Sequence, residues 1–232
     1  MKVSNKNTER TIIVEFNGLP GLGKTTVANA LINNLIECGS TVDNGTNRYS
    51  RLQTRRSPVP ELFNLDLYRQ VVNYAKTIPP LERNRKHLNW VNYFAWKYKL
   101  IEKKCEADFA IIDEGILQFF ASIAHPDNMP QSSQVDAIVG KLKDLGISFI
   151  RVDCVNHVDE AVSRVISRPA RGLAFESMSP NYLYESMKNW AANLDYLKTV
   201  FSRIYNDQKV VTIDTKDSVE KNVSIIKGYL HR

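Results

Sequence analysis

Gly18-Leu19-Pro20-Gly21-Leu22-Gly23-Lys24-Thr25 fits the phosphate-binding pattern G-x-x-x-x-G-K-[ST] at every fixed position. Glycines let such a loop fold tightly around a polyphosphate, with backbone N–H groups pointing inward. In this pattern the lysine reaches the β and γ phosphates, and the threonine hydroxyl can ligate Mg²⁺. The predicted nucleotide-binding residues are therefore Gly18, Leu19, Pro20, Gly21, Leu22, Gly23, Lys24, Thr25 and Thr26.

A strand and a helix flank this loop in the order that a phosphate site requires. Residues 11–16 form a β-branched run that predicts a buried strand. Residues 24–37 carry apolar side chains at helical spacing, so the positive end of the helix dipole is expected to face the phosphates. The alternative, a glycine-rich turn without a ligand, does not account for this arrangement.

The composition indicates one globular domain over residues 1–232. With 232 residues, of which 43% are hydrophobic, the chain can bury one core and is short for two. The formal charge of +6 permits nucleic acid binding without requiring it. The three cysteines, Cys38, Cys105 and Cys154, lie far apart and predict reduced thiols. Because no apolar targeting or membrane-spanning segment is visible, we expect a cytoplasmic protein that does not insert into membranes.

Predicted strands and helices alternate along most of the chain. This order is typical of a three-layer α/β/α fold with a mostly parallel, five-stranded central sheet. A second strand is only weakly indicated between residues 41 and 60. The other expected strands are 109–113, 147–153 and 209–214, and the expected helices after the first are 61–76, 81–106, 131–145, 158–167, 181–205 and 219–230.

Two carboxylates follow the apolar run at residues 109–112. Ligands bind outside the carboxyl ends of parallel strands, so Asp113 is a candidate for the second magnesium-holding residue beside Thr25. Its alternative role is a helix cap. Glu114 could take a proton from an acceptor hydroxyl, or it could simply begin the next helix near the dipole.

Three arginines, Arg164, Arg168 and Arg171, are spaced by four and three residues. On a helix this spacing places Arg164 and Arg168 on one face, and Pro169 with Gly172 suggests a loop beyond it. A lid over residues 164–180 could deliver guanidinium groups to a phosphoryl group in transfer. A solvated basic face is the alternative.

These blocks together resemble the P-loop nucleoside and nucleotide kinases, either the thymidylate-kinase-like or the deoxynucleoside-kinase-like branch. The resemblance rests on residues 16–26, 111–115, 164–171 and 211–215. It implies ATP and Mg²⁺ as ligands and a helical lid formed by the arginine segment. It also implies that Asp214, Thr215 and Lys216 border the adenine, and that residues 61–106 recognise the acceptor.

The chain also departs from both branches. It has Asp113-Glu114 where thymidylate kinases commonly have Asp-Arg. Deoxynucleoside kinases place a catalytic carboxylate after the second strand, where Asp43 is the nearby candidate. Arginines that could contact an acceptor phosphate instead are Arg48, Arg51, Arg55, Arg56, Arg83 and Arg85.

The sequence therefore predicts a Mg²⁺-dependent kinase that transfers the γ-phosphoryl group of ATP to a small acceptor, such as a nucleoside, a nucleoside monophosphate or a related metabolite. The main alternative is a P-loop ATPase that switches partners without such an acceptor. The pattern Thr215-Lys216-Asp217-Ser218 lacks the final Asp of a guanine-reading motif, which makes a GTPase a weaker option. A kinase acting on nucleic acid ends and a homodimeric assembly remain open.

Overall fold

The computed structural model describes residues 11–44, 65–76, 95, 97–99, 101, 105–123, 132–168 and 178–230. Several predictions on acceptor and lid residues lie outside these ranges. They concern Arg171 and most of the expected helix at 81–106, together with the arginines between residues 48 and 85.

The centre of the fold is a five-stranded sheet with the strand order β2-β3-β1-β4-β5. Every pairing between neighbouring strands in it is parallel. The central strand, β1, is buried over its last five residues because helices cover both of its faces. The strands are β1 (Ile12–Asn17), β2 (Val42–Asn44), β3 (Phe109–Ile112), β4 (Ile150–Cys154) and β5 (Val210–Ile213).

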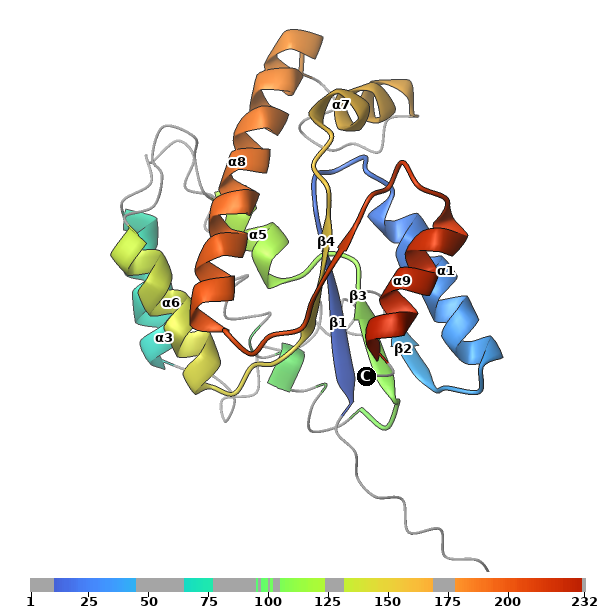
Figure 1. Ribbon diagram of the computed structural model, residues 1–232. Helices are drawn as coiled ribbons and strands as arrows, with labels where there is room; N and C mark the ends of the chain where they lie inside the picture. Colours follow the sequence, from blue (N-terminus) through green and yellow to red (C-terminus); the bar gives the residue numbers. More distant parts are fainter. Residues whose placement is uncertain are drawn as a thin grey trace, which may run out of the picture.

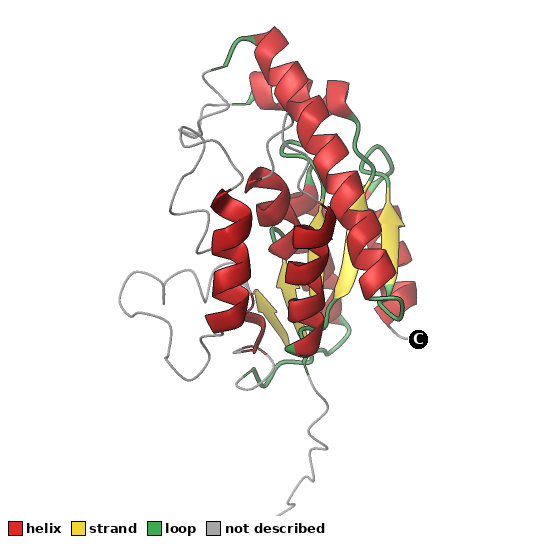
Figure 2. Ribbon diagram, turned by 90° about the vertical axis from the view of Figure 1, so that its left-hand side faces the viewer, coloured by secondary structure: helices red, strands yellow, loops and turns green. Residues whose placement is uncertain are grey.

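Helices form a layer on each face of this sheet (Figure 1). One layer consists of α1 (Lys24–Glu37) and α9 (Val219–Leu230), which pack against each other. The other contains α5 (Ile116–Ile123), α6 (Ser132–Asp144) and α8 (Pro180–Ile204), with α3 (Leu65–Lys76) packed outside α6. Figure 2 shows the long α8 crossing the sheet, and α7 (Val158–Ser167) lies against α8. The predicted three-layer α/β/α fold with a parallel five-stranded sheet is confirmed.

Local signals placed several elements well. Helix α8 begins at Pro180, and the Ser179 side chain before it accepts a hydrogen bond from the Tyr182 amide, as expected of a helix cap. Helix α7 has the predicted bounds. Helix α5, in contrast, was not predicted, because its eight mostly apolar residues are short enough to fit a buried strand as well as a helix. The strand expected from residue 147 begins only at Ile150.

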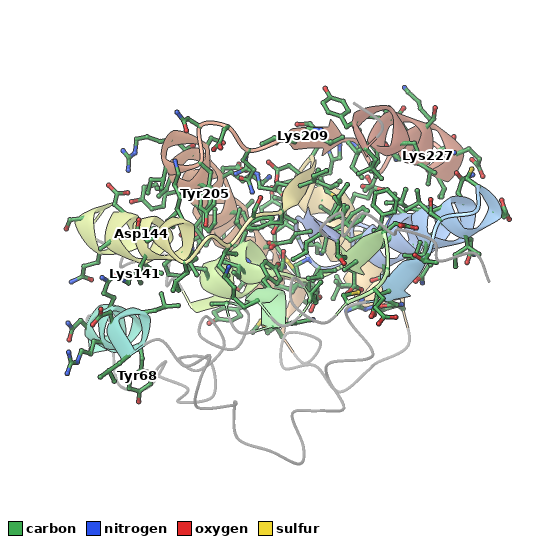
Figure 3. All side chains as sticks on the ribbon, turned by 90° about the horizontal axis from the view of Figure 1, so that it is seen from below. Tyr68, Lys141, Asp144, Tyr205, Lys209 and Lys227 are labelled. Carbon is green, nitrogen blue, oxygen red and sulfur yellow. The ribbon has the colours of Figure 1, made fainter. Side chains whose placement is uncertain are left out.

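The two ends of the sheet differ in what they present. A cavity of about 640 Å³ opens at the amino ends of β1, β4 and β5, where Phe149, Tyr205 and Lys209 line it. Figure 3 views the molecule from this side. The glycine loop follows the carboxyl end of β1 and therefore lies at the opposite end of the sheet. No helix among the described residues has the length and apolarity needed to cross a membrane.

Candidate active site

The glycine loop connects β1 to α1 and packs closely against two other elements. Gly21 and Gly23 have φ angles of +88° and +87°, in the left-handed region that favours glycine. A Cβ atom on Gly21 would lie 2.7 Å from the carbonyl oxygen of Ala161 in α7. A Cβ atom on Gly18 would lie 2.8 Å from the Cβ of Cys154 at the end of β4. The loop therefore needs glycine for its shape and for its packing.

Lys24, the first residue of α1, lies against this loop. Its Nζ donates hydrogen bonds of 2.9 Å to the carbonyl oxygens of both Gly18 and Leu19. Burial lowers the pKa of its ammonium group, whereas the nearby carboxylate of Glu114 opposes this shift. Because the amine is buried next to the loop, it can meet a phosphate without first losing a full hydration shell.

The next residue, Thr25, meets Asp113 across the site. The Thr25 hydroxyl donates a hydrogen bond of 3.0 Å to Oδ2 of Asp113. Asp113 follows β3, the strand that pairs with β1, so the two side chains meet at one edge of the sheet. A hydroxyl and a carboxylate are hard oxygen ligands of the kind that Mg²⁺ prefers, and they fit a site that also uses phosphate oxygens.

Glu114 lies at the open side of the same turn, two residues before α5 begins at Ile116. The protein around it removes part of its hydration and raises the pKa of its carboxyl group. The ammonium group of Lys24 opposes this shift, and the charge of Asp113 adds to it. A carboxyl group with a raised pKa beside a phosphate loop is suited to accepting a proton.

Two of the three predicted lid arginines, Arg164 and Arg168, lie among the described residues and differ in their contacts. Arg164, in α7, donates a hydrogen bond of 3.0 Å from Nη1 to the carbonyl oxygen of Leu22 and forms an ion pair with Glu160. Helix α7 ends at Ser167, so Arg168 is the residue just after the helix and has extended backbone angles. Pro169 follows Arg168, and a residue before proline disfavours the helical conformation. Arg168 still lies close enough to Lys24 for its charge to lower the pKa of that amine.

Two side chains that the sequence analysis missed hold the start of the loop. The amide of Gly18 donates a hydrogen bond of 3.3 Å to Oε1 of Gln118, which is buried in α5. The amide of Leu19 donates a hydrogen bond of 3.3 Å to Oδ1 of Asn156. Asn156 comes just after β4, at the end of the sheet where ligands bind, and this position could have identified it from the sequence as a candidate site residue. Gln118 gave no signal because α5 itself was not predicted.

Asp214, Thr215 and Lys216 follow β5, on the α7 side of the loop. Oδ1 of Asp214 lies 2.9 Å from Nε2 of His157 and accepts a hydrogen bond of 2.9 Å from the Lys216 amide. The hydrogen bond from the Lys216 amide lowers the pKa of Asp214 most, and the contact with His157 lowers it further. Within the described part of the chain, the buried Thr215 hydroxyl oxygen has no hydrogen-bond partner. These contacts fasten the segment after β5 to the start of α7.

Buried charges lie on the acceptor side of the predicted site. Lys97 is 4% exposed, and burial lowers its pKa to about 8, although Asp113, Glu15 and Asp43 all oppose the shift. Asp43 lies within β2 rather than after it, and it accepts a hydrogen bond of 3.7 Å from the Cys105 thiol. Lys97 was not singled out from the sequence, because its neighbours meet it only through tertiary packing.

Comparisons with known proteins give a likeness in fold. No protein-family model matches the chain, and a comparison with curated proteins finds no match. A structure of deoxyadenosine kinase from M. mycoides with dCMP and dCDP bound covers 95% of this chain and 99% of its own, with 17% identity and a TM-score of 0.55. A structure of deoxyadenosine kinase from M. mycoides with bound dATP covers 95% and 100%, with 16% identity and a TM-score of 0.50. The chain thus has the α/β fold of these nucleoside kinases, as the resemblance in sequence implied.

Proposed function

We propose that this chain is a Mg²⁺-dependent kinase that transfers the γ-phosphoryl group of ATP to a small acceptor. The observation that carries the proposal is the contact between Thr25 and Asp113, beside a glycine loop that holds Lys24. Phosphoryl transfer requires a phosphate cradle, a metal and cations more than it requires covalent chemistry from the protein. The described residues offer candidates for the phosphate cradle, the metal ligands and the cations, all at the carboxyl ends of β1 and β3.

The donor half of the site works by positioning and by charge. The amides of the glycine loop and the helix dipole of α1 bind the phosphates. On nucleotide binding, Nζ of Lys24 exchanges the carbonyl oxygens of Gly18 and Leu19 for phosphate oxygens. Thr25 and Asp113 would hold Mg²⁺, which when bound neutralises charge on the β and γ phosphates. Arg168 adds a further cation near Lys24.

The acceptor half is proposed to accept a nucleoside, a nucleoside monophosphate or a related metabolite. The deoxyadenosine kinases that share the fold were solved with dCMP, dCDP or dATP bound, which favours a nucleoside-type acceptor here. In this proposal Glu114, whose carboxyl pKa is raised by burial, removes the proton from an acceptor hydroxyl. A phosphate acceptor would need no such base, because it already carries negative charge.

Acceptor-dependent ADP release tests the proposal. We expect one member of a panel of nucleosides, nucleoside monophosphates and phosphate-free metabolites to stimulate ADP release from MgATP by at least about tenfold. Omission of Mg²⁺ should abolish that stimulation. The proposal fails if ATP binds but no panel member raises the rate.

A P-loop ATPase that switches partners is the second candidate. The adjacent carboxylates Asp113 and Glu114 favour it, because a base beside the phosphate loop can also activate water. It predicts slow ATP turnover that no small acceptor changes. The same panel therefore separates the two functions.

A further inference from the structure

Glu15 is a carboxylate that the donor and acceptor roles leave unused. It lies in the central strand β1 with no exposed surface, between the buried apolar residues Val14 and Phe16. Carboxylates are almost never fully buried unless they are paired or hydrogen-bonded. Its hydrogen-bond partners should therefore show which parts of the structure it stabilises.

The first contact is with the start of α5. Oε1 of Glu15 accepts a hydrogen bond of 3.1 Å from the Leu117 amide, and the Ile116 amide also donates to the carboxylate. A Cβ atom on Gly115 would overlap the Glu15 carboxyl group. Glu15 therefore lies directly beneath the Asp113–Gly115 turn and satisfies amides that the first turn of a helix leaves without partners.

The second contact is with Tyr98. The Tyr98 hydroxyl donates to Oε2 of Glu15, and the Tyr98 ring packs edge-on against Phe149 with 5.5 Å between centroids. Tyr98 is 1% exposed and follows Lys97, whose charge also faces Glu15 and Asp113. One carboxylate thus joins the segment of Lys97 and Tyr98 to the turn that carries Asp113 and Glu114.

We propose that Glu15 is a positioning residue: its carboxyl group fixes the Asp113–Gly115 turn relative to Tyr98, so that the metal side and the acceptor side of the site keep one geometry. The catalytic consequence rests on the proposed kinase function. The structural link does not, since it consists of hydrogen bonds within the chain.

The ionisation of Glu15 offers a readout of this link. Burial raises its pKa to about 7, while Tyr98, the amides of Leu117 and Ile116, and Arg151 from β4 oppose the shift. Lys97 and, at the end of α8, Tyr205 also face it. Protonation places a hydrogen on one carboxyl oxygen, which then donates to Tyr98 instead of accepting from it. Glu15→Gln imitates that state, because its amide donates on one side and accepts on the other.

The structural test follows the Leu117 amide resonance by NMR in the full chain between pH 5 and 9. We expect the resonance to titrate with a midpoint of about 7. The transition should be absent in Glu15→Gln. It should move to higher pH in Tyr98→Phe, which removes a donor that stabilises the charge. Tyr205→Phe is the matched control, because the buried Tyr205 hydroxyl has no hydrogen-bond partner among the residues that the structure describes, and it should leave the midpoint unchanged. An equal transition in Glu15→Gln would overturn the link.

The catalytic test measures ADP release with the best acceptor. Glu15→Ala should lower kcat at least about tenfold, since small displacements of catalytic groups are costly, while the KM for ATP stays within about twofold. Glu15→Gln should recover part of kcat but lack the transition near pH 7 that the parent shows. Superimposable kcat profiles for Glu15→Gln and the parent would overturn the positioning role. If the parent shows no acceptor-dependent activity, the kinase proposal fails and the Leu117 titration still decides the link.

Discussion

The Thr25 hydroxyl donates a hydrogen bond of 3.0 Å to Oδ2 of Asp113, although 88 residues separate the two in sequence. Parallel pairing between β1 and β3 brings the ends of these strands together, and α1 begins directly after the loop that follows β1. Asp113 therefore reaches the first turn of α1, where the phosphates of a nucleotide are expected.

Removing the Lys24 amine should remove phosphoryl transfer without unfolding the chain. Lys24→Ala is expected to lower acceptor-dependent ADP release by about 100-fold or more, because a preorganised charge at the phosphates is lost. Burial already disfavours the charged amine, so the melting temperature should change little. Lys221→Ala, an exposed lysine on α9, is the control and should retain full activity. Turnover that survives in Lys24→Ala would contradict the site assignment.

Asp113 and Glu114 should respond differently to neutral substitution. Asp113→Asn removes a proposed metal ligand and is expected to abolish turnover at ordinary Mg²⁺ concentrations. If Glu114 is the base, Glu114→Gln should lower kcat by about 100-fold with a hydroxyl acceptor and flatten the acidic limb of the pH profile, because the parent carboxyl group must be ionised to accept a proton. Steady-state kinetics from pH 5 to 9 measures both. Unchanged turnover in Glu114→Gln would show that Glu114 is not the base.

Gly21 should not tolerate a side chain. Gly21→Ala combines a φ of +88° with a Cβ atom 2.7 Å from the Ala161 carbonyl oxygen, so we expect a loss of about 1–3 kcal/mol in the free energy of unfolding, together with weaker ATP binding. Gly140→Ala is the matched control. Gly140 lies inside α6 with nothing near its would-be Cβ atom, and alanine there should stabilise the chain by about 0.5–1 kcal/mol. Urea unfolding compares the two, and equal stability would contradict the packing of α7 on the loop.

The stability of the chain should depend on pH through Glu15. Its pKa is about 7 in the folded state against 4.5 without burial, so between these values the folded chain binds a proton that the unfolded chain has lost. This contribution to stability is present below pH 4.5 and is lost as the pH rises through 7. The difference between these two pKa values corresponds to about 3 kcal/mol in the free energy of unfolding.

Urea unfolding at pH 5, 6, 7 and 8 measures this effect. Glu15→Gln carries no titrating group at this position, so its free energy of unfolding should rise relative to that of the parent by about 3 kcal/mol across the interval. Tyr205→Phe should follow the parent at each pH. A difference between Glu15→Gln and the parent that is constant with pH would show that Glu15 does not titrate near neutrality.

Much of the fold follows from local patterns in the sequence. The glycine loop, the apolar run before Asp113 and the helices α7 and α8 carry strong signals, because strand and helix periodicity and the caps of helices depend on near neighbours. Helix α5 was missed because a mostly apolar run of only eight residues has the length of a buried strand as well as that of a short helix.

The sequence by itself predicted an α/β fold, which the structure confirms, and a phosphate-binding loop over Gly18–Thr25, because that motif specifies its own backbone shape. Only the tertiary structure decided how the loop is held. Gln118 in α5, Asn156 after β4 and Arg164 in α7 all hydrogen-bond to its backbone, and these partners are set by how the elements pack together. From its neighbours in sequence, Glu15 is only a charged residue in a predicted strand. Burial under the Asp113–Gly115 turn, which arises only when β1 and α5 pack together, gives it a partner and a role.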